Sequence, residues 1–384
     1  MAQIGDLRVF HGKTGHYDEL PSSSTKYLIA EAIIKLGLSI LESPEGKGSL
    51  VQVAQAILRE GSQSTRFSHI YRDSPDNMPY WIGKFLTSMR GNFPTVYISA
   101  NVQGEAEAER YEWGRDMRSY DAGVAGNIYL SKVMIDNMLF ARENCEIAGD
   151  TYNLLKFEMG VSVAHEIVHL LTGFLTGGYR PVTPREVALE AYAEGRKGEA
   201  GRYWEGILLG GVVESWTKGT DIMGVRQAGT HYLFETGSKR SNGWRVSKTY
   251  INRFINGDFS FPIQASNPEE VVTRGTLENA GYSKTALLRR RAMRAPPAGS
   301  PAPDHPSANM AYRRLPAERE QYYSQSRRPT EVYTAQSSSQ APPYPPYPSS
   351  SSNRYYDSQP EASTRPYYQQ SGGPSQFYDP YPRR

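Results

Sequence analysis

The chain has 384 residues, a formal net charge of +3 and a single cysteine, Cys145. One cysteine excludes an intramolecular disulfide and any zinc finger built on cysteine ligands. The sequence shows no secretory signal pattern, no Asn-x-Ser/Thr acceptor and no apolar run approaching the roughly 18 residues of a membrane span, so we expect a cytoplasmic or nuclear protein without a membrane partner.

Composition divides the chain near residue 290. Aliphatic and aromatic side chains recur throughout residues 1–290, and a segment of this length can bury a sizeable core. From Arg289 onward the chain carries 13 arginines, no lysine and seven acidic residues, which gives +6 and leaves −3 for the preceding part. The folded part therefore has no broad basic surface, and no specific nucleic-acid partner is expected.

The part before residue 290 is predicted to be α+β, with a small sheet before a long apolar helix and a mainly helical second half. Hydrophobic periodicity and capping residues predict the elements in chain order. They are a helix over 26–41, a shorter helix over 49–59, strands over 94–102 and 126–130, the apolar helix over 157–175, and helices over 184–213, 246–255 and 268–274. The strand within 95–101 is also a candidate edge for an extended peptide, by strand addition.

The apolar helix contains the most informative residues of the chain, His165-Glu166-Ile167-Val168-His169. Histidines four residues apart lie on the same helix face, because one turn takes 3.6 residues. Both imidazoles can therefore reach one metal ion, and Glu166 lies near the same point. This HExxH spacing is the pattern of zinc metallopeptidases, in which two histidines bind zinc and the glutamate is the general base.

The surroundings of the motif favour a metal site. The two histidines and Glu166 are the only ionisable groups between Glu158 and Tyr179, within an otherwise apolar helix. An imidazole pair buried without partners would be costly, and a metal ion satisfies both rings. The competing interpretation is two hydrogen-bonded core histidines beside a solvated glutamate.

Over about residues 90–215 the chain resembles the zincin superfamily of zinc metallopeptidases, in which strands precede the metal-binding helix and helices follow it. The metzincin pattern HExxHxxGxxH would require Gly at 172 and His at 175, where this chain has Thr172 and Leu175. That subclass is excluded. The resemblance then implies a third ligand from a later carboxylate, as in gluzincins, together with a position open to water.

Five glutamates after the motif are candidates for this ligand: Glu186, Glu190, Glu194, Glu199 and Glu205. Glu199 is the first choice, because its small neighbours Gly198, Ala200 and Gly201 would let a second helix approach the first. Glu190 and Glu194 remain alternatives, although their spacing with Glu186 also suits a solvated helix face. A structural or supporting role suits Glu205 better.

The resemblance also implies a mechanism. Zinc held by His165, His169 and Glu199 would activate a water molecule, and Glu166 would take the water proton and pass it to the leaving amine. The predicted function is therefore a zinc-dependent peptidase acting on a peptide or protein substrate.

The oxyanion of the transition state needs a further hydrogen-bond donor. His231 is a candidate, against the interpretation of an ordinary surface or loop histidine. Tyr192 and Tyr203 are further candidates that the sequence does not rank.

Residues 291–384 are rich in Tyr, Pro, Ser, Gln and Arg and almost lack Val, Ile and Leu, which predicts a disordered tail. The sequence APPYPPYP at 341–348 offers P-x-x-P frames of the kind that SH3 domains bind. A passive solvated tail is the competing interpretation. The alternative to the peptidase is accordingly a non-enzymatic metal-binding or scaffold protein whose tail recruits partners.

Overall fold

The computed structural model describes residues 3–13, 15–62, 69–102, 104–177, 183–193, 197–218 and 226–286, all within one compact unit. The predicted α+β class is confirmed for these residues. The predicted tail, 291–384, with its P-x-x-P frames, lies outside the described residues.

The first sheet combines three parallel strands with two antiparallel edge strands, in the order β2-β1-β3-β5-β4. Its strands are β1 (Val9–Lys13), β2 (His16–Glu19), β3 (Thr95–Ser99), β4 (Ala106–Arg110) and β5 (Gly126–Ser131). The strands predicted over 94–102 and 126–130 are confirmed as β3 and β5. The prediction that the first of them offers a free edge is wrong, because β3 lies between β1 and β5, and the edge strands are β2 and β4.

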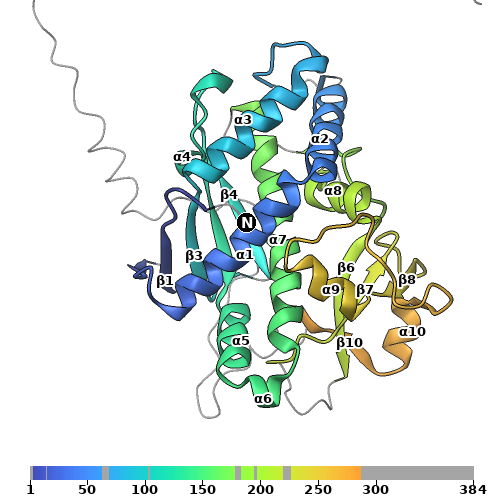
Figure 1. Cartoon of the computed structure of the whole chain (residues 1–384). Helices are drawn as coiled ribbons and strands as arrows, with labels where there is room; N and C mark the ends of the chain where they lie inside the picture. Colours follow the sequence, from blue (N-terminus) through green and yellow to red (C-terminus); the bar gives the residue numbers. More distant parts are fainter. Residues whose placement is uncertain are drawn as a thin grey trace, which may run out of the picture. The chain divides into compact units, whose positions relative to one another are not determined.

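Helices of the first half pack on this sheet and on one another (Figure 1). They are α1 (Thr25–Glu42), α2 (Pro44–Ser62), α3 (Met78–Gly91), α4 (Ala122–Ala125), α5 (Lys132–Glu143) and α6 (Cys145–Ala148), with 3-10 turns at Pro75–Asn77 and Met117–Ser119. The helices predicted over 26–41 and 49–59 are confirmed as α1 and the longer α2. Ser24 begins α1, since its side chain accepts a hydrogen bond from the Tyr27 amide.

Helix α7 (Thr151–Thr176) is the central element of the described structure, and Figure 1 shows it between the two sheets. It packs closely on α1, where a Cβ atom at Gly160 would lie 2.4 Å from Leu36 Cδ2. Among the described residues it is the one helix long and apolar enough to cross a membrane, but 83% of its most apolar window is buried within the protein. Burial of that extent is typical of a core helix of a globular domain.

The second half is built on an antiparallel sheet, in the order β10-β6-β7-β8-β9, and the expected mainly helical second half is wrong. Its strands are β6 (Val212–Lys218), β7 (Thr230–Phe234), β8 (Asn242–Arg245), β9 (Val271–Thr273) and β10 (Tyr282–Lys284). Three helices accompany them: α8 (Ala200–Leu209), α9 (Lys248–Phe254) and α10 (Arg274–Asn279). The helix predicted over 246–255 is confirmed as α9, whereas the helix predicted over 268–274 is wrong, since β9 lies within that range.

The helix predicted over 184–213 is reduced to α8. Turns and irregular backbone occupy the described residues before Glu199, and Gly210 ends the helix with a φ of +82°, a conformation that glycine adopts without strain. The chain then continues as β6, whose Val-Val-Glu-Ser-Trp-Thr sequence favours a strand because β-branched and aromatic side chains fit a pleated surface. Helical periodicity in glutamates was therefore a misleading signal here.

Candidate metal centre

Helix α7 presents His165 and His169 one turn apart, as their spacing predicts. The helix is well placed to do so, because its apolar residues on either side of the motif, including Ala164, Ile167 and Val168, are fully buried. The histidines are held on a rigid element, and their rings have little freedom to move apart.

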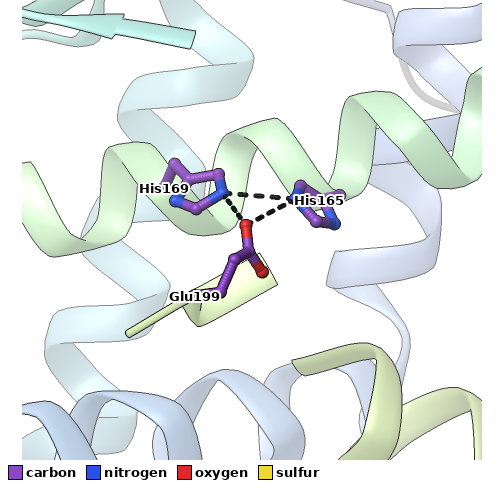
Figure 2. A group of neighbouring side chains, drawn as sticks. All are labelled: His165, His169 and Glu199. Atoms are coloured by element: carbon purple, nitrogen blue, oxygen red, sulfur yellow. Dashed lines mark hydrogen bonds and ion pairs between the residues drawn. The ribbon is translucent and has the colours of Figure 1, made fainter. Parts of the chain in front are cut away.

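Glu199 meets both imidazoles (Figure 2). Its Oε1 atom lies 2.7 Å from His169 Nε2 and 3.1 Å from His165 Nε2, and the two Nε2 atoms are 3.2 Å apart. Among the described residues, this is the one group in which three His, Cys, Asp or Glu side chains lie close enough together to bind a metal ion. The structure thus brings together the three ligands predicted from the sequence.

The three donor atoms are close enough together to hold one metal ion. Ligand atoms about 2.0–2.2 Å from a tetrahedral zinc ion lie roughly 3.4 Å from one another. The triangle found here is tighter, with edges of 2.7, 3.1 and 3.2 Å, and a point about 2.1 Å from all three atoms lies about 1.2 Å above its plane. Three protein donors with a fourth position open to water are the composition of catalytic rather than structural zinc sites.

Glu199 is the residue that begins α8, and its backbone explains its orientation. One carboxylate oxygen, Oε2, accepts a hydrogen bond from the Arg202 amide and caps the helix, which leaves Oε1 for the histidines. Gly201 allows the approach of the two helices, because a Cβ atom there would lie 2.4 Å from His165 Nε2. Of the small residues that favoured Glu199 in the sequence, Gly201 has the expected packing role, whereas Gly198 lies against the backbone of Pro184 and Val187.

A second layer of residues orients His165. Glu205 Oε1 lies 2.6 Å from His165 Nδ1, and both oxygens of Glu205 accept hydrogen bonds from Arg202 at 2.8 Å. A carboxylate on the distal nitrogen fixes the imidazole tautomer and ring orientation, as is usual for histidines that bind metals. The supporting role expected for Glu205 is seen in these contacts.

The electrostatic environment favours positive charge at His165. Burial by itself would lower the pKa of His165, but the carboxylates of Glu199 and Glu205 outweigh it and raise the pKa to about 10. Burial would raise the pKa of Glu199, but the two imidazoles hold it well below the ordinary glutamate value. A cation at this position would meet the same attraction.

Glu166 lies between the histidines and the edge strand β4. Its Oε2 atom accepts a hydrogen bond of 2.7 Å from the Ala108 amide. Burial raises the pKa of Glu166 above the ordinary glutamate value, although the two histidines and this hydrogen bond oppose the rise. A glutamate with a raised pKa beside a candidate metal site has properties that suit a general base.

The backbone N–H and C=O groups of alternate residues in β4 point away from the rest of the sheet. Glu105 and Tyr111, on either side of β4, are hydrogen-bonded to Ser131 in β5 and to Ala125 just before it. The amides between these odd-numbered residues point the other way, as the bond from Ala108 to Glu166 shows. The outward edge of β4 thus runs directly beside Glu166.

A cleft of about 400 Å³ opens at this site. Its wall comes from β4, α7, α8, β6 and the end of β10, and it includes His165 and Glu166. A cavity of this volume accommodates several residues of an extended peptide or a small ligand.

The remaining candidates from the sequence lie elsewhere. His231, in β7, is buried, stacks edge-on against Phe157 and has its Nε2 atom 3.9 Å from Glu158 Oε2. It is not part of the cleft wall, so its position gives the predicted oxyanion role no support. Tyr192 contacts Glu214 through its hydroxyl group, and Tyr203 packs partly buried against the core.

Of the alternative third ligands, those within the described part of the chain do not belong to the cluster. Glu186 and Glu190 are exposed and lie in turns before α8. Glu194 lies outside the described residues.

Two contributors to the site were not recognised from the sequence. The Ala106–Arg110 segment alternates small and charged residues, AEAER, which is a period-two signal for a strand. Arg202 precedes Glu205 by three residues, the spacing of neighbours on one helix face. The contact of β4 with Glu166, and the support that Arg202 and Glu205 give to His165, depend on packing between distant parts of the chain.

Comparison with known proteins adds no further information: the chain matches no protein-family model, no curated protein and no solved structure.

Proposed function

We propose that this protein is a zinc-dependent peptidase of the zincin type, with a gluzincin-like ligand set of His165, His169 and Glu199. The observation that carries the proposal is the triangle of donor atoms, closed by a residue 30 positions after the motif. The same distances are those of hydrogen bonds, so zinc content decides between a metal site and two core histidines bonded to a carboxylate.

Glu166 has the catalytic role in this proposal. When bound, zinc supplies Lewis acidity, which lowers the pKa of a water molecule and polarises a carbonyl group. Glu166 accepts the proton of that water and delivers it to the leaving amine. The hydrogen bond from the Ala108 amide fixes the carboxylate between the zinc position and the strand.

The edge of β4 is the natural place for an extended substrate. Its outward backbone groups can pair with a peptide as an added strand, which positions a peptide bond of the substrate beside Glu166. The cleft wall on the other side is formed by α7 and α8 and includes His165, so the peptide would lie between the strand and this histidine.

The proposal is tested by zinc content and by turnover, measured on the same purified full-length proteins. We expect one zinc per chain in the wild type by plasma mass spectrometry, and its loss in His165→Ala and Glu199→Gln. His16→Ala, at an exposed histidine in β2, is the matched control and should keep the metal. Absence of zinc from the wild type after reconstitution contradicts the proposal.

Glu166→Gln separates metal binding from catalysis. The variant should retain zinc, since Glu166 is not a ligand, and lose hydrolysis of a mixed peptide library by roughly 10²–10⁴-fold. Cleavage products are identified by mass spectrometry. Zinc bound without hydrolysis in the wild type would leave a metal-binding protein without peptidase activity.

A further inference from the structure

Arg202 is connected to two of the three candidate metal ligands. Its backbone amide donates a hydrogen bond to Glu199 Oε2, and its guanidinium Nη1 donates to both oxygens of Glu205 at 2.8 Å. Glu205 in turn accepts a hydrogen bond of 2.6 Å from His165 Nδ1. Because Glu205 is only 1% exposed, its charge requires the arginine as a partner. The group that holds the Arg202 side chain in place therefore also acts on His165.

The ring of Tyr192 holds the Arg202 side chain. The Cζ atom of Arg202 lies 5.4 Å from the centroid of this ring, within the range of a cation–π contact. Among the described residues, Glu205 and Tyr192 are the hydrogen-bond and cation–π partners found for this guanidinium group. Tyr192 is not part of the cleft wall, so it affects the candidate site only through its neighbours.

The hydroxyl group of Tyr192 is attached to the second sheet. It donates a hydrogen bond of 3.3 Å to Glu214 Oε1 in β6 and accepts one of 3.4 Å from Arg274 Nη2, at the start of α10. Glu214 and Arg274 are themselves an ion pair whose side chains are 9% and 4% exposed. The hydroxyl group is therefore held by a buried pair, and the ring is fixed beside the guanidinium from both ends.

The backbone before Tyr192 also places its ring. Ala191 has a φ of +67°, the one non-glycine residue with a positive φ among those described, and this conformation costs free energy. The Leu189 carbonyl accepts a hydrogen bond of 3.0 Å from the Tyr192 amide, which makes Ala191 the position at which a type II turn requires a positive φ. The Glu190 carbonyl accepts a bond of 2.9 Å from the Gly237 amide, and a Cβ atom at Gly237 would lie 2.6 Å from the Tyr192 ring. The turn and the glycine together fix the position of the ring.

We propose that Tyr192 is a positioning residue of the candidate metal centre, which acts on His165 through Arg202 and Glu205. The ring keeps the guanidinium on Glu205, and Glu205 keeps the imidazole in the orientation that brings its Nε2 atom to Glu199. The inference rests on the proposed function for the metal, whereas the contacts themselves belong to the metal-free chain. A tyrosine that serves packing alone would affect stability and leave the geometry of the ligands unchanged.

The first measurement needs no metal. In chelator-treated full-length protein with isotope-labelled histidine, NMR detects the Nδ1 proton of His165, assigned by its absence from His165→Ala. A charge-assisted hydrogen bond to a buried carboxylate shifts this proton downfield and slows its exchange with water. We expect the signal in the wild type and in Tyr192→Phe, which keeps the ring, and its loss in Tyr192→Leu.

The second measurement follows the metal ligands. Zinc affinity of Tyr192→Leu, measured by competition with a chelator, should fall about tenfold, as it does when groups that orient metal ligands are removed. The visible spectrum of the cobalt-loaded protein, which reports ligand geometry, should change as well. Tyr192→Phe should keep both properties of the wild type. Tyr282→Leu is the matched control, because it removes a tyrosine ring 5.0 Å from the Lys218 ammonium group and should leave both unchanged.

A double-mutant cycle tests whether the effect passes through Arg202. Arg202→Gln should itself lower zinc affinity, and adding Tyr192→Leu to it should cost less than about threefold more, because residues that act as one unit are not additive. Additive losses overturn the inference, as does wild-type affinity with an unchanged cobalt spectrum in Tyr192→Leu. If circular dichroism shows that Tyr192→Leu is unfolded, Tyr192→Met replaces it, since a flexible methionine fills irregular space.

The inference and the proposed function fail in different ways. If wild-type protein binds no zinc, and the His165 signal is present there and lost in Tyr192→Leu, the positioning role stands and the peptidase function is wrong. If zinc binds and peptides are hydrolysed while every Tyr192 variant keeps the His165 signal and wild-type zinc affinity, the peptidase function stands and the positioning role is wrong.

Discussion

Gly201 shows how one small residue controls the geometry of the candidate site. It sits in the first turn of α8, against the ring of His165, at the place where α7 and α8 meet. The glycine determines how closely Glu199 approaches the two histidines, since both residues belong to the same helix start. The distance between a carboxylate and an imidazole is therefore set here by a residue that carries no functional group.

Replacing this glycine tests the relation. In Gly201→Ala, the added methyl group would lie 2.4 Å from the imidazole, so either the ring or α8 must shift. We expect zinc affinity, measured by competition with a chelator, to fall at least tenfold, as disturbance of ligand orientation does in other metal sites. The free energy of unfolding should decrease by about 1–3 kcal/mol, the usual effect of overpacking.

The matched control is Gly48→Ala, at an exposed glycine of α2 where an added Cβ meets no atom within 4 Å. Alanine has the higher helix propensity, so this variant should be stabilised by up to about 1 kcal/mol and should bind zinc normally. Wild-type zinc affinity in Gly201→Ala would show that the approach of α8 does not set the ligand distances.

At the scale of single residues, the sequence is informative about side chains that lie close together along the chain. His165, Glu166 and His169 follow from helical periodicity alone, and Glu199 was preferred because its neighbours are small. The contact between Ala108 and Glu166 could not be predicted in the same way, because it joins residues 58 positions apart through a backbone amide that any residue provides. His231 was chosen for its side-chain chemistry, and the fold directs it toward Phe157 and Glu158.

Among the elements, the second sheet differs most from expectation. Its strands are short and separated by long connections, and their pairing depends on contacts that no local window contains. An ion-pair group links β6 to its neighbour β10 and to α10: Arg274, at the start of α10, and Lys284, in β10, both contact Glu214 in β6. The Arg274 and Glu214 side chains are only 4% and 9% exposed, so each charge depends on the other for compensation.

The pH dependence of stability should report this group. Burial would raise the pKa of Glu214, but Lys284 and Arg274 outweigh it and lower the pKa below the ordinary glutamate value. A carboxylate with a lowered pKa in the folded state stabilises the protein above its unfolded pKa of about 4.3, and this contribution is lost as the pH falls through the folded value.

Glu214→Gln should therefore lose roughly 3 kcal/mol of unfolding free energy at pH 7, the usual effect of leaving a buried charge without its partner. The difference from wild type should shrink as the pH falls from about 4.3, the unfolded value, through the lowered folded value, because the wild-type carboxylate then becomes protonated too. Urea denaturation at several pH values measures both quantities. Glu143→Gln is the control, and a difference that persists unchanged at low pH would contradict the assignment.

For the whole molecule, the proposed zinc links folding to metal concentration. Ligands from α7 and from the start of α8 come together only in the folded chain, so zinc binds the folded state in preference to the unfolded one. A ligand at about 1,000 times its dissociation constant adds about 4 kcal/mol to stability.

We expect the thermal midpoint of the zinc-loaded protein to exceed that of the chelator-treated protein by roughly 5–10 °C. Calorimetry measures the shift. His165→Ala should show none, and magnesium should not replace zinc, because it prefers oxygen ligands in octahedral geometry. A shift of equal size in His165→Ala would place the stabilising metal elsewhere.

Helix α7 contributes both to the hydrophobic core and to the candidate site, two roles that proteins often divide between elements. Its side chains form the centre of the hydrophobic core, and the same helix carries His165, Glu166 and His169. A substitution on α7 therefore affects both the stability of the fold and the geometry of the candidate site. Variation is freer on β4, where the cleft-lining residues Ala106 and Glu107 are half-buried and exposed, respectively. We expect relatives of this chain to diverge along that strand while α7 stays nearly unchanged.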